Sequence, residues 1–157
     1  MDVRAARPDE ETAARAVAAA AFETQRTVYR PSAEAIAHAS QLALERLVAL
    51  AGGELVGTAR WGIEGDRLRV IGLAVLPGHR RRGIARALVE ELAGIARDSG
   101  CSALALYTVV QTGNVAVFER LGFAVVHEEP ATDAISPTGQ PLTEAYLERV
   151  VEPGPTR

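Results

Sequence analysis

The residues with the clearest chemical potential in this chain are three consecutive arginines, 80–82, and the Gly83 that follows them. They lie between an apolar, β-branched run that ends at Pro77-Gly78 and an apolar pattern of helical period that begins at Ile84. The first N–H groups of a helix have no internal partner and lie at the positive end of its dipole, so they bind phosphate well. Gly83 lets the backbone approach such an anion closely. The sequence therefore predicts a phosphate or pyrophosphate site at a strand–turn–helix junction.

Two common phosphate-binding motifs do not fit this segment. A Walker loop needs a lysine, and the chain contains none; a dinucleotide fingerprint needs three glycines, and only Gly83 lies between Arg80 and Gly94. What remains is the pattern Arg80-x-x-Gly83-x-Ala85, preceded by Leu-Ala-Val at 73–75. This pattern resembles the acyl-coenzyme A binding motif of the GNAT family of N-acetyltransferases.

A second segment carries the same resemblance independently. From Thr112 the chain reads T-G-N-V-A-V-F-E-R-L-G-F. It is similar to the family's second cofactor segment, in which an Asn precedes a short helix that ends in an aromatic residue, two polar residues and Leu-Gly-Phe. The resemblance runs with decreasing clarity from Leu47 to Val150, and the first forty or so residues match in outline.

The resemblance implies acetyl-CoA as co-substrate and a set of residues that bind it. Backbone groups of the strand at 73–75 would bind the pantetheine arm, and one N–H there would face the thioester oxygen. The turn and the helix start would bind the pyrophosphate, and the second segment would line the cofactor. The predicted cofactor-binding residues are Leu73, Ala74, Val75, Arg80, Arg81, Arg82, Gly83, Ile84, Ala85, Asn114 and Phe118.

The chemistry implied by the resemblance has two proton transfers to arrange. The attacking amine must lose a proton, and the coenzyme A thiolate must be solvated or protonated as it leaves. In the family a tyrosine commonly acts as the acid, and Phe118, which cannot donate a proton, stands at its position. The thiolate then leaves without that acid, takes a proton from water or the substrate, or uses another hydroxyl such as that of Tyr107 or Thr112. For the base, Glu23 and Tyr29 lie in a loop expected to shape the acceptor pocket, Glu64 precedes the central strand, and a water chain serves equally. The predicted catalytic residues are Glu23, Tyr29, Glu64 and Tyr107.

Composition limits the remaining possibilities. At 157 residues we expect one domain, residues 1–151, followed by a disordered tail at 152–157. The net charge of −3 argues against nucleic acid as a partner, and a lone Cys101 with scattered histidines predicts no metal site. A single cysteine, no apolar run near ~20 residues and no basic leader predict a cytoplasmic protein without membrane contact. The absence of lysine beside abundant Ala and Arg suggests a bacterial, high-GC source.

Periodicity supplies the elements that must hold these residues. We predict helices near 10–22, 32–43, 84–100 and 114–121, and strands near 3–6, 47–51, 54–61, 67–76, 103–110, 124–128 and 145–151. Strands that alternate with helices, plus one hairpin, indicate an α/β domain with a mixed sheet. The resemblance implies more: a GNAT-like single domain whose mixed central sheet, flanked by helices, contains splayed strands ending near Val75 and Val109.

The sequence thus favours an enzyme. We expect an acyltransferase that moves an acetyl group from acetyl-CoA to a primary amine of a small molecule or peptide by direct attack. The alternative is a non-catalytic acyl-CoA-binding or regulatory GNAT-like module, which Phe118 supports. An exposed edge strand could also pair with a second copy, so a homodimer stays open.

Overall fold

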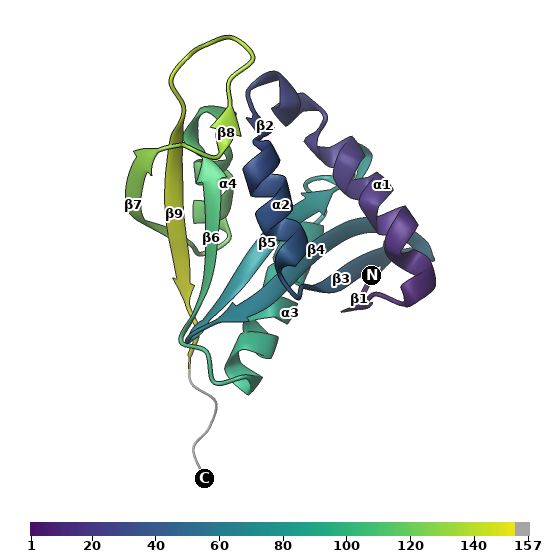
Figure 1. The fold of residues 1–157 in the computed structure, drawn as a ribbon. Coiled ribbons are helices and arrows are strands. Elements are labelled where there is room, and N and C mark those ends of the chain that lie inside the picture. The colour runs from purple at the N-terminus through teal and green to yellow at the C-terminus, as the bar shows by residue number, and fades with distance from the viewer. Residues whose placement is uncertain (153–157) are drawn as a thin grey trace.

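The computed structural model describes residues 1–152, so residues 153–157 of the predicted tail lie outside the described residues. A seven-stranded sheet runs through the molecule in the order β1-β3-β4-β5-β6-β9-β7 (Figure 1). A separate two-stranded sheet pairs β2 with β8. The strands are β1 (Asp2–Ala5), β2 (Arg30–Pro31), β3 (Glu45–Ala51), β4 (Glu54–Glu64), β5 (Arg67–Val75), β6 (Ala103–Val109), β7 (Ala124–Pro130), β8 (Ala134–Ile135) and β9 (Thr143–Val150). The helices are α1 (Glu11–Phe22), α2 (Ala33–Gln41), α3 (Ile84–Asp98) and α4 (Asn114–Arg120).

The central strands β5 and β6 separate along their length. They form a parallel pair through Arg67↔Ala103, Leu68↔Leu104 and Arg69↔Ala105, and the pairing ends there, whereas the other sheet pairs are antiparallel. From Val70 onward β5 is paired with β4 on one side only. The predicted mixed α/β fold with flanking helices is confirmed, and the divergence of β5 from β6 is the splay expected from the resemblance.

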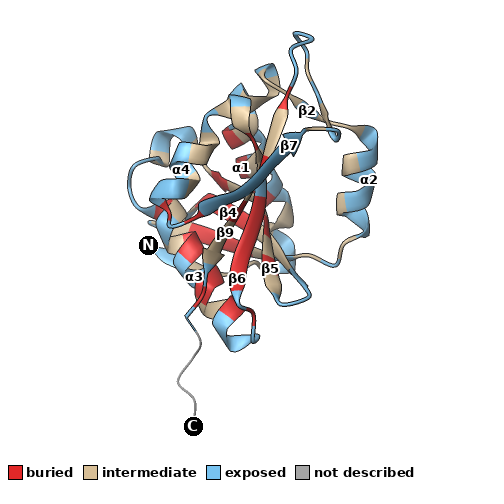
Figure 2. Cartoon of the chain, turned by 90° about the vertical axis from the view of Figure 1, so that its left-hand side faces the viewer, coloured by how far each residue is buried: buried red, intermediate tan, exposed pale blue. Residues whose placement is uncertain are grey.

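The helices form two layers around the sheet. Figures 1 and 2 show α3 and α4 on one face and α2 on the other. Helix α3 buries an apolar stripe that includes Leu88 and Leu92 against alternate residues of the central strands, such as Leu68. Helix α1 buries Ala14, Val17 and Ala21. Helix α2 has no buried residue, so it stands away from the core on the face of the sheet opposite α3. None of the helices within residues 1–152 is both long and apolar enough to cross a membrane.

The predicted elements differ from the observed ones mainly in the segment between β7 and β9. The prolines of this segment predict a loop, whereas the structure contains β8 there, paired with β2 through Arg30↔Ile135 and Pro31↔Ala134. Strands of two residues are too short to show a period, so pattern reasoning missed them. The pairing ties the segment after α1 to the segment before β9.

Candidate functional site

A cleft of about 540 Å³ opens where the elements predicted to bind the cofactor meet. It lies between the C-terminal end of β5, the start of α3, helix α4 and the end of α1. All the predicted cofactor-binding residues except Arg82 line it. The other lining residues are Ala21, Phe22, Gln25, His79, Arg86, Val117, Arg120 and Leu121.

The start of α3 presents free backbone donors to this cleft. Gly83 at the N-cap has φ +79°, and no side chain of the described residues caps the helix. Arg81 has φ +64°, a conformation that costs a residue other than glycine about 1–2 kcal/mol. Strain of this kind persists where the surrounding structure holds it, and left-handed residues are typical of turns whose backbone N–H groups bind an anion. The turn and the helix start can therefore bind a phosphate group.

The arginines of this turn have different positions. Arg80 lines the cleft and donates from Nη2 to the Ala21 carbonyl at 3.0 Å, which joins the turn to the end of α1. Arg81 also lines the cleft, whereas Arg82 does not. Arg86, in the first turn of α3, lines the cleft and donates to the Arg120 carbonyl at 2.9 Å. Positive charge therefore surrounds the cleft on the α3 side.

A β-bulge lies at the point where β5 leaves β6. Thr58 pairs with Ala74 and Arg60 with Ile71, so one residue of β4 opposes two residues of β5, Gly72 and Leu73. Gly72 adopts φ +70°, which glycine tolerates and other residues rarely do. The bulge redirects the backbone N–H groups beside the splay. An extended ligand can hydrogen-bond to this unpaired edge as a further strand would.

The second predicted segment forms the opposite wall. Asn114 opens α4, and its backbone N–H donates to the Thr112 hydroxyl at 3.3 Å. The Phe118 ring packs edge-on against Phe123, with ring centres 5.9 Å apart, and lines the cleft. The structure therefore places an apolar ring, not a proton donor, at this wall.

The predicted catalytic residues do not line this cleft, and Glu23 lies in the chain between Phe22 and Gln25, which do. Glu23 follows α1 and is exposed, and Tyr29 lies with its ring 5.3 Å from the Arg26 guanidinium. Glu64 forms an ion pair with Arg69 at 3.3 Å. Of the four predicted catalytic side chains, none is among the residues that line the 540 Å³ cleft.

Tyr107, the fourth of them, belongs to a stack of planar groups on the face of the sheet opposite α3. Its ring lies 4.9 Å from the Arg69 guanidinium and 4.9 Å from the ring of Tyr146, which in turn stacks on His127 at 5.1 Å. Burial, and then the hydrogen bond to Glu148, raise the pKa of Tyr146 to about 12, so its hydroxyl stays protonated at neutral pH. The stack brings together four strands that the sequence analysis did not connect.

Several lining residues were not identified from the sequence. Ala21, Phe22 and Gln25 reach the cleft because α1 ends above β5, and nothing in their local pattern indicates it. Arg86 and Arg120 look like ordinary exposed helix residues in the sequence. His79 also lines the cleft, and its buried Nδ1 has no hydrogen-bond partner among the described residues. In the described part of the chain, no cluster of His, Cys, Asp and Glu suits a metal ion.

Comparisons with known proteins agree with this geometry. A family model described as the acetyltransferase (GNAT) family matches residues 12–123. The streptothricin acetyltransferase of Streptomyces lavendulae is 37% identical over 76 residues, which are 48% of this chain and 39% of that protein. The match to a second curated relative covers 53% of its length, so the chain spans about half or less of either relative.

Solved structures show the same fold over nearly the whole chain. A nourseothricin acetyltransferase superposes with a TM-score of 0.73 at 21% identity and covers 96% of this chain and 98% of its own. An aminoglycoside 6'-N-acetyltransferase complexed with coenzyme A superposes with a TM-score of 0.70 at 17% identity and covers 99% and 100%. At these identities the likeness concerns the fold.

Proposed function

The chain belongs to the acetyltransferase (GNAT) family, and from that premise we propose that it transfers an acetyl group from acetyl-CoA to a primary amine of a small molecule or peptide. The observation that carries this proposal is one cleft with an uncapped helix start and a β-bulge along its walls. The uncapped helix start suits a diphosphate, and the β-bulge suits a polarised carbonyl. The proposed catalytic domain is residues 1–151.

The cofactor would follow the cleft from α3 to the bulge. Its pyrophosphate would bind the N–H groups of Gly83, Ile84 and Ala85 with Arg80 and Arg81 beside them. The pantetheine arm would pair with the free edge of β5 at 73–75. Similar folds solved with coenzyme A and with acetyl-CoA support this choice of ligand.

The reaction would occur at the bulge. The amine nitrogen attacks the thioester carbon, the N–C bond forms, and the carbonyl oxygen becomes an oxyanion. A backbone N–H beside Gly72 that donates to this oxygen can lower the barrier by roughly 3 to 4 kcal/mol. Collapse of the intermediate breaks the C–S bond, the nitrogen loses its proton, and the thiolate takes one up.

Both protons would move through water. Phe118 has no proton to give, and the predicted residues Glu23, Tyr29, Glu64 and Tyr107 lie outside the cleft lining. We therefore expect single substitutions Glu23→Gln, Tyr29→Phe, Glu64→Gln and Tyr107→Phe each to lower kcat less than the roughly 100-fold loss typical of a true general acid or base. A loss above 100-fold in one of them, with the protein still folded, would identify that residue as the acid or base instead.

Phe118 also favours a second candidate, an acyl-CoA-binding module without catalysis. Two measurements separate the candidates: calorimetric titration with acetyl-CoA, and thiol release from acetyl-CoA in the presence of a panel of primary amines. Binding with amine-dependent thiol release supports the enzyme. Binding without release for any amine supports the module. No binding would exclude both.

A further inference from the structure

Arg60 occupies an unusual place beside the bulge. It lies on β4, is half-buried, and pairs in register with Ile71 of β5. Its Nε and Nη2 atoms each lie 3.9 Å from where a Cβ on Gly72 would be. The guanidinium therefore lies next to the backbone at which the thioester would react.

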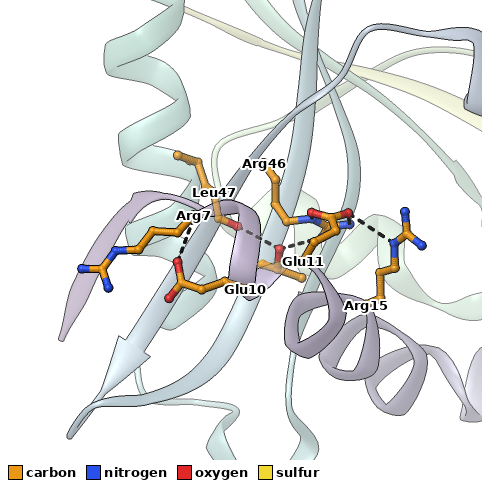
Figure 3. Close-up of polar contacts among 7 residues, drawn as sticks. Arg7, Glu10, Glu11, Arg15, Arg46 and Leu47 are labelled. Atoms are coloured by element: carbon orange, nitrogen blue, oxygen red, sulfur yellow. Dashed lines mark hydrogen bonds and ion pairs between the residues drawn. The ribbon is translucent and has the colours of Figure 1, made fainter.

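This guanidinium has no partner within residues 1–152, where no hydrogen bond or ion pair reaches it. Its cross-strand neighbour Arg46 is satisfied: its Nε and Nη2 donate to the Glu11 carboxylate at 2.9 and 3.1 Å, and its Nη1 donates to Thr58 at 2.9 Å (Figure 3). The same carboxylate also pairs with Arg15 at 3.3 Å. Two arginines, Arg46 and Arg15, thus share the Glu11 carboxylate, and the neighbouring Arg60 does not bind it.

Such an arrangement is unfavourable for the folded protein alone. Like charges directly opposite on paired strands repel, and a half-buried charge without a partner loses hydration for no return. Burial, and then Arg46, lower the pKa of Arg60, although a guanidinium remains charged at neutral pH. A ligand anion would supply the missing partner.

The position of Arg60 indicates which ligand this is. The proposed diphosphate site is at the start of α3, and α3 and α4 cover the other face of the sheet, so the cofactor does not need Arg60. The amine would reach the bulge from the face that Arg60 shares with Ile71, which carries α1 and is bordered by the segment that follows α2. A guanidinium there matches a carboxylate in two parallel hydrogen bonds.

We propose that Arg60 binds a carboxylate of the acceptor, which makes the acceptor an amine with a carboxylate a few bonds from its nitrogen, such as a free amino acid. This inference rests on the proposed function, since it places the acceptor at the acetyl-CoA thioester. It also explains why the chain retains an unpaired arginine at this position.

The direct test measures kcat/KM for amino acids and for their uncharged amides, for example L-alanine and L-alaninamide. A charge-assisted pair predicts that the acid-to-amide ratio falls roughly 10- to 100-fold in Arg60→Gln. Arg15→Gln is the matched control, because it removes an exposed arginine of the same cluster and should leave the ratio unchanged. An unchanged ratio in Arg60→Gln would overturn the inference while leaving the acetyltransferase activity established.

The carboxylate that pairs with Arg60 could instead belong to the acyl group of the acyl-CoA. In that case the wild-type protein would prefer succinyl-CoA to acetyl-CoA, and Arg60→Gln would lose this preference without any change in the acid-to-amide ratio. That result would overturn the assignment to the acceptor.

A binding measurement keeps the inference testable if no amine is acetylated. With saturating coenzyme A present, N-acetylglycine should raise the Tm of the wild-type protein more than N-acetylglycinamide does, and Arg60→Gln should abolish the difference. Equal effects of the two compounds on the wild-type protein would overturn it. Without ligand, Arg60→Gln should unfold at or above the wild-type Tm; a clearly lower Tm would assign Arg60 a structural role instead.

Discussion

The two arginine groups of this protein differ in how the chain builds them. Arg80–Arg82 are consecutive, largely exposed and placed at a helix start by the local sequence. Arg46 and Arg60 are fourteen positions apart, and the register of β3 with β4 brings them together on one face of the sheet. Arg80–Arg82 cost the folded protein little stability because water solvates them, so their charge alone identifies no ligand. Burying Arg46 and Arg60 lowers the stability of the folded protein unless each charge has a partner. The unpaired Arg60 is therefore the stronger sign of a ligand.

The first prediction tests the phosphate site proposed beside Arg80–Arg82 at the start of α3. Gly83→Glu places a negative side chain at a position of positive φ beside the proposed diphosphate, so acetyl-CoA affinity should fall roughly 100-fold or more, equivalent to about 2.7 kcal/mol. Calorimetry measures this. Gly139→Glu is the control, because Gly139 has φ +77° and open space around it but lies in another loop. If Gly83→Glu binds as well as the control, the helix start is not the diphosphate site.

The second prediction concerns the bulge that lies between the two groups. Gly72→Ala forces a side chain into φ +70°, so the bulge should relax and move its N–H away from the thioester oxygen. We expect kcat to fall roughly 10-fold, less than for complete removal of an oxyanion donor, and stability to fall by about 1–2 kcal/mol. Gly65→Ala, at φ +61° in the β4–β5 turn, should show a similar stability loss with unchanged kcat. Equal kcat in both variants would remove the bulge from the chemistry.

The third prediction concerns Arg46 and Arg60, the arginines that the pairing of β3 with β4 brings together. Glu11→Gln removes the carboxylate that Arg46 binds; since Glu11 is 42% exposed and solvent screens the pair, the stability loss should be about 1 kcal/mol. Acetyl-CoA affinity should not change.

The pH dependence of this loss follows from the Glu11 pKa. The hydrogen bond from Arg46 is the main cause that lowers this pKa in the folded state. The contribution is therefore present above the unfolded pKa near 4.5 and is lost as the pH falls through the lower folded value. Denaturant unfolding of both proteins from pH 7 to pH 3 should show the difference shrinking toward acid. A difference that grows toward acid would contradict the assignment.

The smallest effect is expected at Phe118. If this ring only packs against Phe123 and the cofactor, Phe118→Tyr should change kcat by no more than about twofold, whereas a restored acid would raise it roughly 100-fold or more. Steady-state kinetics with the preferred amine decide this, with acetyl-CoA affinity as the control. A large rise in kcat at constant affinity would show that the chain lacks an acid.

Much of the fold and of the cofactor site could be predicted from sequence because the signals are local. The helix at 84–98 has a strong apolar period, and the turn before it combines Gly83 with arginines. The proposed acceptor side could not be predicted in the same way. Arg60 looks like one more solvated strand arginine, and the pairing of β2 with β8 joins segments a hundred residues apart.

By itself, then, the sequence determined the order of elements, the family and an anion site at a helix start, because each depends on neighbours within a few residues. The tertiary structure alone decided which charges lack partners and which face of the splay they border. These features depend on strand register, on burial and on the binding of Glu11 by both Arg46 and Arg15. They are properties of the packed chain, so no short stretch of sequence predicts them.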